Sequence, residues 1–298
     1  MTSAAGTAYG LVMGTLPAPR DISGPEATAA IHEQGAHLVT WTPTGGQPVL
    51  WVSRDTLLEE GTAIRGGVPI CFPWFGPGRS GDLKPAHGFA RITEWKLADR
   101  ISEDDAAAAT ARFILTHEDI DPQLRGAFPH PFRAVYTVDF GAELIMSLTV
   151  TNTGSTAFEF EEALHTYLSV GDSRRISIDG LDGARYFDKV AQQEEQQSGA
   201  VTITDETDRV YHSQDTVRVK DPAMGRTITV AKEGSANTVV WNPWTEKSKA
   251  MDDFADAEWQ SMVCVETANV LGDAVHVDAG KSHTMTQRLS VSRDSLLR

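Results

Sequence analysis

Residues 132–170 read FRAVYTVDFGAELIMSLTVTNTGSTAFEFEEALHTYLSV, and this stretch indicates the fold most strongly. Its short runs are rich in valine, isoleucine, threonine and aromatic residues, and glycine and asparagine separate them. Runs of this kind, bounded by turn residues, are typical of β-strands. We therefore expect strands at Phe132–Phe140, Ala142–Thr151 and Phe158–Val170.

The same pattern continues on both sides of this stretch, and no long segment has a helical period. A polar segment at 246–258 is compatible with a short helix. The segment Glu103–Ala109 could form a helical turn or a hairpin tip. Residues 191–199 are expected to form a solvated loop. So many short strands predict an all-β protein, a large antiparallel β-sandwich of two packed sheets. Further strands are expected at Ala36–Thr42, Pro48–Ser53, Arg112–Thr116, Arg175–Ile178, Thr216–Val219, Thr227–Val230 and Thr238–Trp241.

The domain organisation follows from composition along the chain. Residues 1–28 are rich in alanine, glycine and proline and are expected to form a loosely ordered leader or an added edge segment. From residue 29 onward there is no shift in composition and no repeat of fixed period. We therefore expect one β-sandwich domain at 29–298.

The net charge of −15 disfavours nucleic acid and anionic membranes as partners. The first basic residue is Arg20, and no long apolar run follows it, so neither a signal peptide nor a membrane span is expected. The two cysteines, Cys71 and Cys264, do not form a secreted disulfide framework, which favours a reduced, cytoplasmic protein. A phosphate site in such an acidic chain needs a local cluster of basic residues.

Two glycine-containing loops offer basic residues. In Ala63–Pro77, AIRGGVPICFPWFGP, Arg65 precedes two glycines that permit close backbone approach to a ligand, and its guanidinium could grip an anion. In His87–Arg91, HGFAR, a second arginine follows Lys84. Arg65, Lys84 and Arg91 could form a phosphate clamp if the loops meet. A rigid turn with surface ion pairs, and a structural role for His87, are the alternatives.

Two strands offer candidate acid and base groups. In Phe158–Val170, a period of two places His165 on the more polar face, where a rigid strand would hold it in a sugar-binding groove. In Ser261–Val270, SMVCVETANV, Glu266 interrupts an apolar run, so desolvation would raise its pKa toward that of a general base. A cross-strand ion pair for His165, or a solvated strand end for Glu266, remains open.

Further segments are candidate walls of a site. Val240–Trp244, VWNPW, offers Trp241 for stacking on a sugar ring, although a core role is equally compatible. Glu206–Tyr211, ETDRVY, offers Asp208 as an acceptor for sugar hydroxyls, or simply a charged turn. No zinc, calcium, dinucleotide or phosphate-loop motif is present, so no metal or cofactor is expected.

Together these segments resemble the hexose-6-phosphate mutarotases, also called glucose-6-phosphate 1-epimerases, of the aldose 1-epimerase superfamily. The resemblance extends from about Ala29 to Val291. It implies a galactose mutarotase-like supersandwich, without metal or cofactor, that acts on a phosphorylated hexose as a monomer. Its motifs are, in order, RGGVPICFPWFG, HGFAR, ALHTYLSV, GLDGARYFDK, ETDRVY, VVWNPW and MVCVETANV.

The resemblance implies His165 as general acid and Glu266 as general base. Glu266 would take the proton of the C1 hydroxyl while His165 protonates the ring oxygen, with the two residues facing each other across the sugar. This assignment requires a protonated His165 and an ionised Glu266 before ring opening. Arg65, Arg91 and Asp208 would contact the substrate.

One departure from the family concerns Ala86, where the family often has glutamine. The contact made by that glutamine is lost or is replaced, with Lys84 as one candidate.

Three alternatives remain at this stage. The protein could be an aldose 1-epimerase of free hexoses, or a non-catalytic sugar-binding or regulatory protein with the same fold. A glycosidase is disfavoured, because it needs two carboxylates flanking the bond and we find one good candidate.

Overall fold

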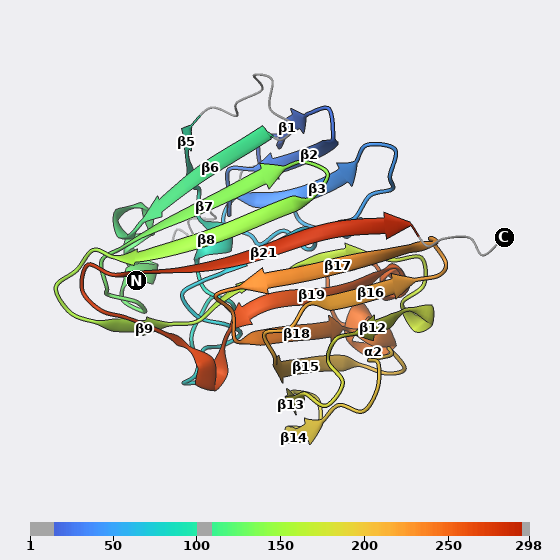
Figure 1. Cartoon of the computed structure of the whole chain (residues 1–298). Helices are drawn as coiled ribbons and strands as arrows, with labels where there is room; N and C mark the ends of the chain where they lie inside the picture. Colours follow the sequence, from blue (N-terminus) through green and yellow to red (C-terminus); the bar gives the residue numbers. More distant parts are fainter. Residues whose placement is uncertain (1–14, 100–108, 294–298) are drawn as a thin grey trace, which may run out of the picture.

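The computed structural model describes residues 15–99 and 109–293. Two large antiparallel sheets form most of it (Figure 1). The first sheet contains β14 (Gln193–Gln196), β13 (Arg185–Asp188), β15 (Thr207–His212), β18 (Asn237–Asn242), β19 (Met262–Asn269), β10 (Glu162–Leu164) and β4 (Ile70–Cys71), with β11 (Tyr167–Ser169) also paired to β19.

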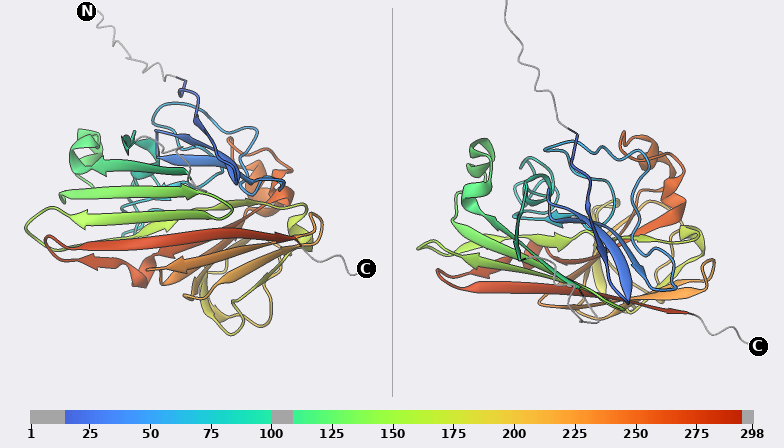
Figure 2. Two further views of the ribbon diagram at one scale, coloured as in Figure 1. Left: turned by 45° about the horizontal axis from the view of Figure 1, so that its top comes forward. Right: turned by 90° about the horizontal axis from the view of Figure 1, so that it is seen from above.

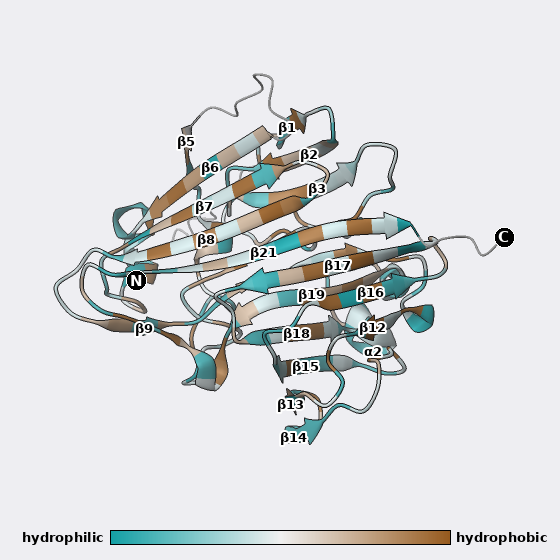
Figure 3. Ribbon diagram, in the orientation of Figure 1, coloured by the Kyte–Doolittle hydropathy of each residue, from teal (hydrophilic) through white to brown (hydrophobic). Residues whose placement is uncertain are grey.

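The second sheet also has eight strands. In order across the sheet these are β12 (Ser177–Asp179), β16 (Val217–Asp221), β17 (Arg226–Glu233), β21 (Ser282–Arg293), β8 (Leu144–Asn152), β7 (Phe132–Phe140), β6 (Ala109–Thr116) and β5 (Lys96–Asp99). Apolar and polar residues alternate visibly along β6, β7, β8 and β21 (Figure 3). This alternation buries one face of each strand in the main hydrophobic core.

The remaining strands form two smaller sheets. One contains β1 (Arg20–Ser23), β2 (Ala27–His32) and β3 (His37–Pro43), and the other contains β9 (Phe158–Phe160) and β20 (Val275–Val277). The helices are short, and they lie on the side away from the long strands of the second sheet (Figure 2). They are α1 (Pro122–Arg125), α2 (Trp244–Lys249) and the 3-10 turns Ala90–Ile92, His117–Asp119, Ser173–Arg175, Glu258–Ser261 and Leu271–Asp273.

The predicted all-β sandwich is confirmed, with local differences. The strand expected at Phe158–Val170 is divided into β9, β10 and β11. Pro48–Ser53 lies beside β11 and makes only isolated bridges, through Leu50 and Val52. The loop expected at 191–199 contains the exposed edge strand β14.

The ends of the chain also bear on the predicted domain boundary. Within the expected leader 1–28, residues 1–14 lie outside the described part, whereas β1 pairs with β2 as the edge strand of the first small sheet. The strand β2 crosses residue 29, so the fold already includes residues before that position. The segment Glu103–Ala109 lies outside the described residues except for Ala109, which begins β6.

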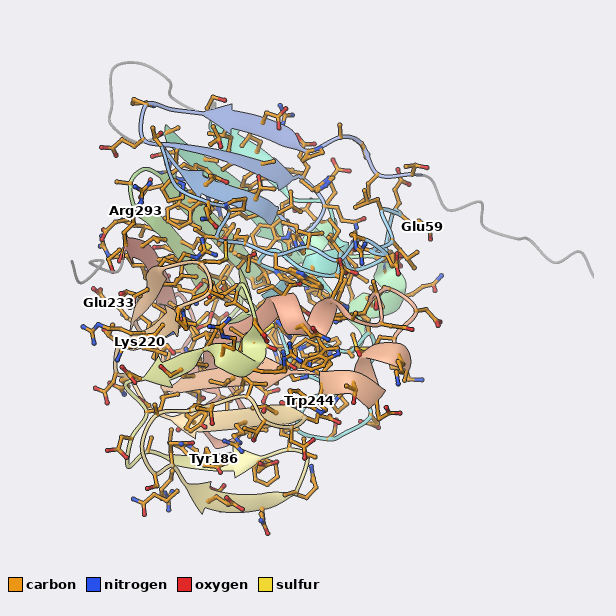
Figure 4. The ribbon with its side chains drawn as sticks, turned by 90° about the vertical axis from the view of Figure 1, so that its right-hand side faces the viewer. Glu59, Tyr186, Lys220, Glu233, Trp244 and Arg293 are labelled. Carbon is orange, nitrogen blue, oxygen red and sulfur yellow. The ribbon has the colours of Figure 1, made fainter. Side chains whose placement is uncertain are left out.

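The main core lies between the two large sheets. Leu164, Leu168 and Val265 of the first sheet belong to the same buried cluster as Leu148 and Met285 of the second. The opposite face of the first sheet is covered by loops and by α2, with a separate buried cluster that includes Tyr167, Trp241 and Cys264. In Figure 4, Tyr186 marks β13, next to the edge strand β14 of this sheet, and Trp244 marks α2. Among the described residues no helix is long and apolar enough to cross a membrane.

Candidate active site

His165 lies in the short break between β10 and β11, opposite Glu266 of the neighbouring strand β19. Leu164 pairs with Thr267 in β10 and β19, and Tyr167 pairs with Cys264 in β11 and β19. The register is therefore continuous across the short break between β10 and β11, which brings His165 opposite Glu266. Nε2 of His165 lies 3.4 Å from Oε1 of Glu266.

Alternation sends these two side chains to the loop-covered face of the sheet. Their neighbours Thr166 and Thr267 point the other way, into the sandwich, where both contact the fully buried Gln287 of β21. The Thr166 hydroxyl donates to the Gln287 carbonyl at 2.6 Å, and the Gln287 amide donates to the Thr267 hydroxyl at 2.9 Å. These hydrogen bonds fix the backbone directly behind the His165–Glu266 pair.

A cavity of about 350 Å³ opens above the pair, a size suited to a small ligand. It brings together six of the residues that the sequence singles out. Its lining contains Arg65, His87, His165, Asp208, Trp241 and Glu266 from that set, together with Phe75, Gly76, Pro77, Ala86, Lys189, Lys247 and Met251.

Arg65 is held by two polar partners at the cavity wall. Its guanidinium donates to Asp253 at 3.1 Å and to the Tyr167 hydroxyl, also at 3.1 Å. The Tyr167 ring in turn stacks on the imidazole of His165, with ring centroids 4.8 Å apart and planes 16° from parallel. Arg65 thus supports the orientation of His165 through Tyr167.

The two glycines after Arg65 have a different use from the one expected. A Cβ on Gly67 would lie 2.2 Å from the Leu38 carbonyl oxygen, and one on Gly66 would lie 2.4 Å from Cα of Val52. Both residues have positive φ angles, 121° for Gly66 and 61° for Gly67. The glycines therefore allow close packing against the protein's own backbone, not close approach to a ligand.

The RGG and HGFAR loops do meet. His87 accepts a hydrogen bond from the Gly76 amide at Nδ1, which leaves Nε2 of the ring as the protonated nitrogen. Arg91 donates to the Ala86 carbonyl at 2.7 Å and is not part of the cavity lining. Its charge nevertheless reaches the site. Desolvation is the main cause that lowers the pKa of both His87 and His165, and the charge of Arg91 lowers both further.

Asp208 and Trp241 lie side by side in β15 and β18. The Asp208 carboxylate pairs with Lys189 at 3.2 Å, and Lys189 also lies over the Phe75 ring, 5.1 Å from its centroid. Trp241 meets His165 edge-on, with ring centroids 6.0 Å apart. The cavity thus has aromatic walls and both signs of charge above a histidine–glutamate pair.

Comparison with known proteins agrees with this arrangement. The family model for aldose 1-epimerase matches residues 21–290. A protein of Escherichia coli K12, provisionally named glucose-6-phosphate 1-epimerase, is 40% identical over 250 residues, which cover 83% of this chain and 81% of the relative. The chain belongs to the aldose 1-epimerase family. It is an isomerase that acts on a sugar.

Solved structures place this epimerase in the same fold. A crystal structure from Salmonella typhimurium, provisionally described as a mutarotase, has a TM-score of 0.83 and 34% identity, and the match covers 92% of this chain and 90% of that one. A galactose mutarotase-related enzyme from Lactobacillus acidophilus has a TM-score of 0.73 and 11% identity, covering 93% of this chain and 98% of that one. The second comparison supports the galactose mutarotase-like fold alone.

Sequence reasoning about this epimerase misplaced two basic residues, Arg91 and Lys84, and missed two others. The structure does not bring Lys84 to the cavity: its side chain is exposed and outside the lining. Lys189 and Lys247 line the cavity instead, the latter paired with Glu206 at 2.7 Å. Lys189 is the last residue of the GLDGARYFDK motif, and this motif could have identified it as a site residue. Lys247 lies in a polar segment, and no sequence pattern there indicates a role in the site.

Burial disfavours the charged forms of His165 and Glu266, which the expected acid–base assignment requires. His165 is 7% exposed and Glu266 is 1% exposed. Desolvation lowers the pKa of His165 well below its usual value, and the charge of Arg91 lowers it further. Desolvation also raises the pKa of Glu266 well above its usual value, with Asp208 adding to the effect. Both shifts favour the neutral forms, an arrangement in which the pair carries one proton, on Glu266.

The relative position of the pair also differs from the expected one. We expected the two residues to face each other with the sugar between them, but their 3.4 Å separation leaves no room for a pyranose ring. They lie next to each other beneath the cavity and would reach a sugar from the same side. This arrangement suits a hemiacetal, whose ring oxygen and hydroxyl are both bonded to C1.

Proposed function

We propose that this epimerase interconverts the α and β anomers of a hexose 6-phosphate, with His165 as general acid and Glu266 as general base. The observation that carries the proposal is the contact between Nε2 of His165 and Oε1 of Glu266 below a cavity of sugar size. A sugar seated with C1 over this contact presents its ring oxygen and its C1 hydroxyl to the two groups at once.

The reaction needs one proton on the pair and conserves it. His165 donates its proton to the ring oxygen while Glu266 accepts the proton of the C1 hydroxyl, and the C1–ring oxygen bond breaks. Rotation about C1–C2 turns the other face of the aldehyde toward the sugar hydroxyl. Ring closure then returns both protons to their starting positions. Each positioned proton transfer contributes about 10²–10⁴-fold to the rate.

Substrate binding supplies the charge state that the unliganded pair lacks. Neither carboxylate oxygen of Glu266 has a hydrogen-bond partner within the described part of the chain. Sugar hydroxyls that donate to these oxygens would stabilise the ionised form of Glu266 and lower its pKa. The shared proton would then move to His165, the group that must donate it.

The basic residues of the cavity support a phosphorylated substrate. Arg65, Lys189 and Lys247 place three cationic groups around the cavity of a chain whose net charge is −15. Charge-assisted hydrogen bonds from such groups are the usual means of holding a phosphate. The chain is also similar to relatives named for glucose 6-phosphate.

The decisive experiment measures exchange between the two anomers of glucose 6-phosphate by NMR, with and without the protein. We expect strong acceleration of exchange, and a smaller effect at equal concentrations of glucose. Faster exchange with glucose would favour an aldose 1-epimerase of free hexoses. An unchanged exchange rate in Glu266→Gln would favour a non-catalytic sugar-binding protein.

Three organisational expectations belong to the same proposal: residues 29–298 form one domain, the protein is a monomer, and it works in the cytoplasm. Limited proteolysis tests the first, light scattering in solution the second, and imaging of the tagged full-length chain the third.

A further inference from the structure

Cys264 lies next to the candidate acid–base pair and has no part in the proposed reaction. It shares with Glu266 the loop-covered face of β19, since the two residues are separated by one position along the strand. Its partners across the sheet are Tyr167 and Trp241. One donor atom each from His165, Cys264 and Glu266 lie within 4.8 Å of one another, and all three residues are buried.

The carboxylate of this cluster lacks hydrogen-bond partners. Both oxygens of Glu266 are buried and make no hydrogen bond to any described residue. An unpartnered buried carboxylate is costly, and a metal ion compensates it as a hydrogen-bond donor would. The cluster thus combines closely spaced nitrogen, sulfur and oxygen donors with unused binding capacity.

We propose that His165, Cys264 and Glu266 form a binding site for a zinc-like divalent ion, and that the bound ion inhibits the epimerase. Thiolate, imidazole and carboxylate together suit zinc, which binds them at about 2.0–2.3 Å in a tetrahedral arrangement. Donors on one such ion lie roughly 3.3–3.8 Å apart, so the cluster contracts by about 1 Å through side-chain rotation. A fourth ligand, water, would come from the cavity, which His165 and Glu266 line.

The proton balance of binding is defined. The ion replaces the thiol proton of Cys264 and the single proton shared by His165 and Glu266, and both protons pass to solvent. No oxidation or reduction is involved. Because protons compete with the metal, zinc affinity increases with pH. The ion occupies the atoms that would otherwise exchange protons with the sugar, so it blocks the reaction.

The inhibition rests on the proposed function, but metal binding does not. The first measurement is therefore zinc binding to the full-length protein by calorimetry, with no sugar present. We expect one ion bound through the cluster, and Cys264→Ser to lower its affinity at least about 10-fold. Cys71→Ser is the matched control, because Cys71 is the other buried cysteine of the chain and lies outside the cluster.

Cobalt gives a test that does not depend on Cys264→Ser folding. A thiolate bound to cobalt has a charge-transfer absorption band, and the chain has only two cysteines. The band must therefore persist in Cys71→Ser. Loss of this absorption band in Cys71→Ser would overturn the proposed site. So would a folded Cys264→Ser variant whose zinc affinity is unchanged, or the absence of zinc binding to the wild type.

The activity measurement separates the two proposals. Zinc should slow glucose exchange in the wild type, and a chelator should restore it, whereas Cys264→Ser keeps its basal rate and resists zinc. Glucose avoids the chelation of zinc by a sugar phosphate. If zinc binds through Cys264 but no sugar is epimerised, the proposed function fails and the metal site stands. Inhibition that is equally strong in Cys264→Ser overturns the inhibitory site.

Discussion

Nε2 of His165 lies 3.4 Å from Oε1 of Glu266, and the strand pairs on both sides of them keep a single register. Two residues about 100 positions apart in the chain are therefore held as direct cross-strand neighbours. Such a pair acts as a unit, since either residue changes the protonation of the other.

The first prediction concerns the pair as a unit. Glu266→Gln and His165→Asn should each lower kcat for anomer exchange by about 10²–10⁴-fold. The double variant should be little slower than the slower single variant, because losing either partner already stops concerted proton transfer. NMR exchange measurements determine all three rates. Glu246→Gln, at an exposed position on α2, is the control and should match the wild type. Fully additive losses in the double variant would show that the two groups act independently.

The second prediction concerns pH. With ordinary pKa values of 6.5 for histidine and 4.5 for glutamate, the singly protonated pair would prevail only between those values. Burial lowers the first pKa and raises the second, so the pair takes a second proton only at lower pH and loses its last proton only at higher pH. Because kcat/KM reports the pKa values of the unliganded protein, the kcat/KM profile should be flat across neutral pH, with its alkaline limb above 6.5.

The profile is measured as kcat/KM for glucose, which carries no phosphate that titrates in this range, after subtraction of the uncatalysed exchange at each pH. A narrow maximum between 4.5 and 6.5 would show that the two groups keep their ordinary pKa values in the protein.

The third prediction identifies the groups that hold the phosphate. Lys189→Met and Lys247→Met should each raise KM for glucose 6-phosphate by about 10-fold, the loss of one charge-assisted hydrogen bond. Lys84→Met should leave KM unchanged, because the Lys84 side chain lies outside the cavity. Steady-state kinetics with glucose in parallel separates phosphate binding from a general disturbance of the site. A larger effect from Lys84 than from either cavity lysine would contradict the assignment.

The fourth prediction tests the packing that positions Arg65. Gly67→Ala introduces a Cβ only 2.2 Å from the Leu38 carbonyl oxygen, so the backbone must move. Gly45→Ala is the matched control: its φ is also positive, at 69°, but nothing lies within 4 Å of the added carbon. Strain alone should cost the control about 1–2 kcal/mol of unfolding free energy, and overpacking should cost Gly67→Ala a further ~1–3 kcal/mol. Urea denaturation of both variants measures the difference in unfolding free energy. Equal losses of unfolding free energy would mean that the loop around Gly67 moves to accommodate the added carbon without cost.

Several features of the fold could be predicted from the sequence. The strand Phe132–Phe140 was predicted with its exact bounds, since a strong alternation ends at a glycine turn. Alternation also placed Leu164 and Leu168 in the core and His165 on the opposite face. The division of Phe158–Val170 into three strands was not predictable, because each part pairs with a segment far away in the sequence: β9 with β20, and β10 and β11 with β19.

The sequence by itself determined the all-β class, the family and the identity of His165 and Glu266 as candidates, because side-chain alternation and motifs are local properties. The tertiary structure alone decided that these two residues are neighbours, that Lys189 and Lys247 line the cavity in place of Lys84, and that Cys264 joins the pair. The physical reason is that strand register and loop packing are set by hydrogen bonds and burial between distant segments, which no local pattern specifies.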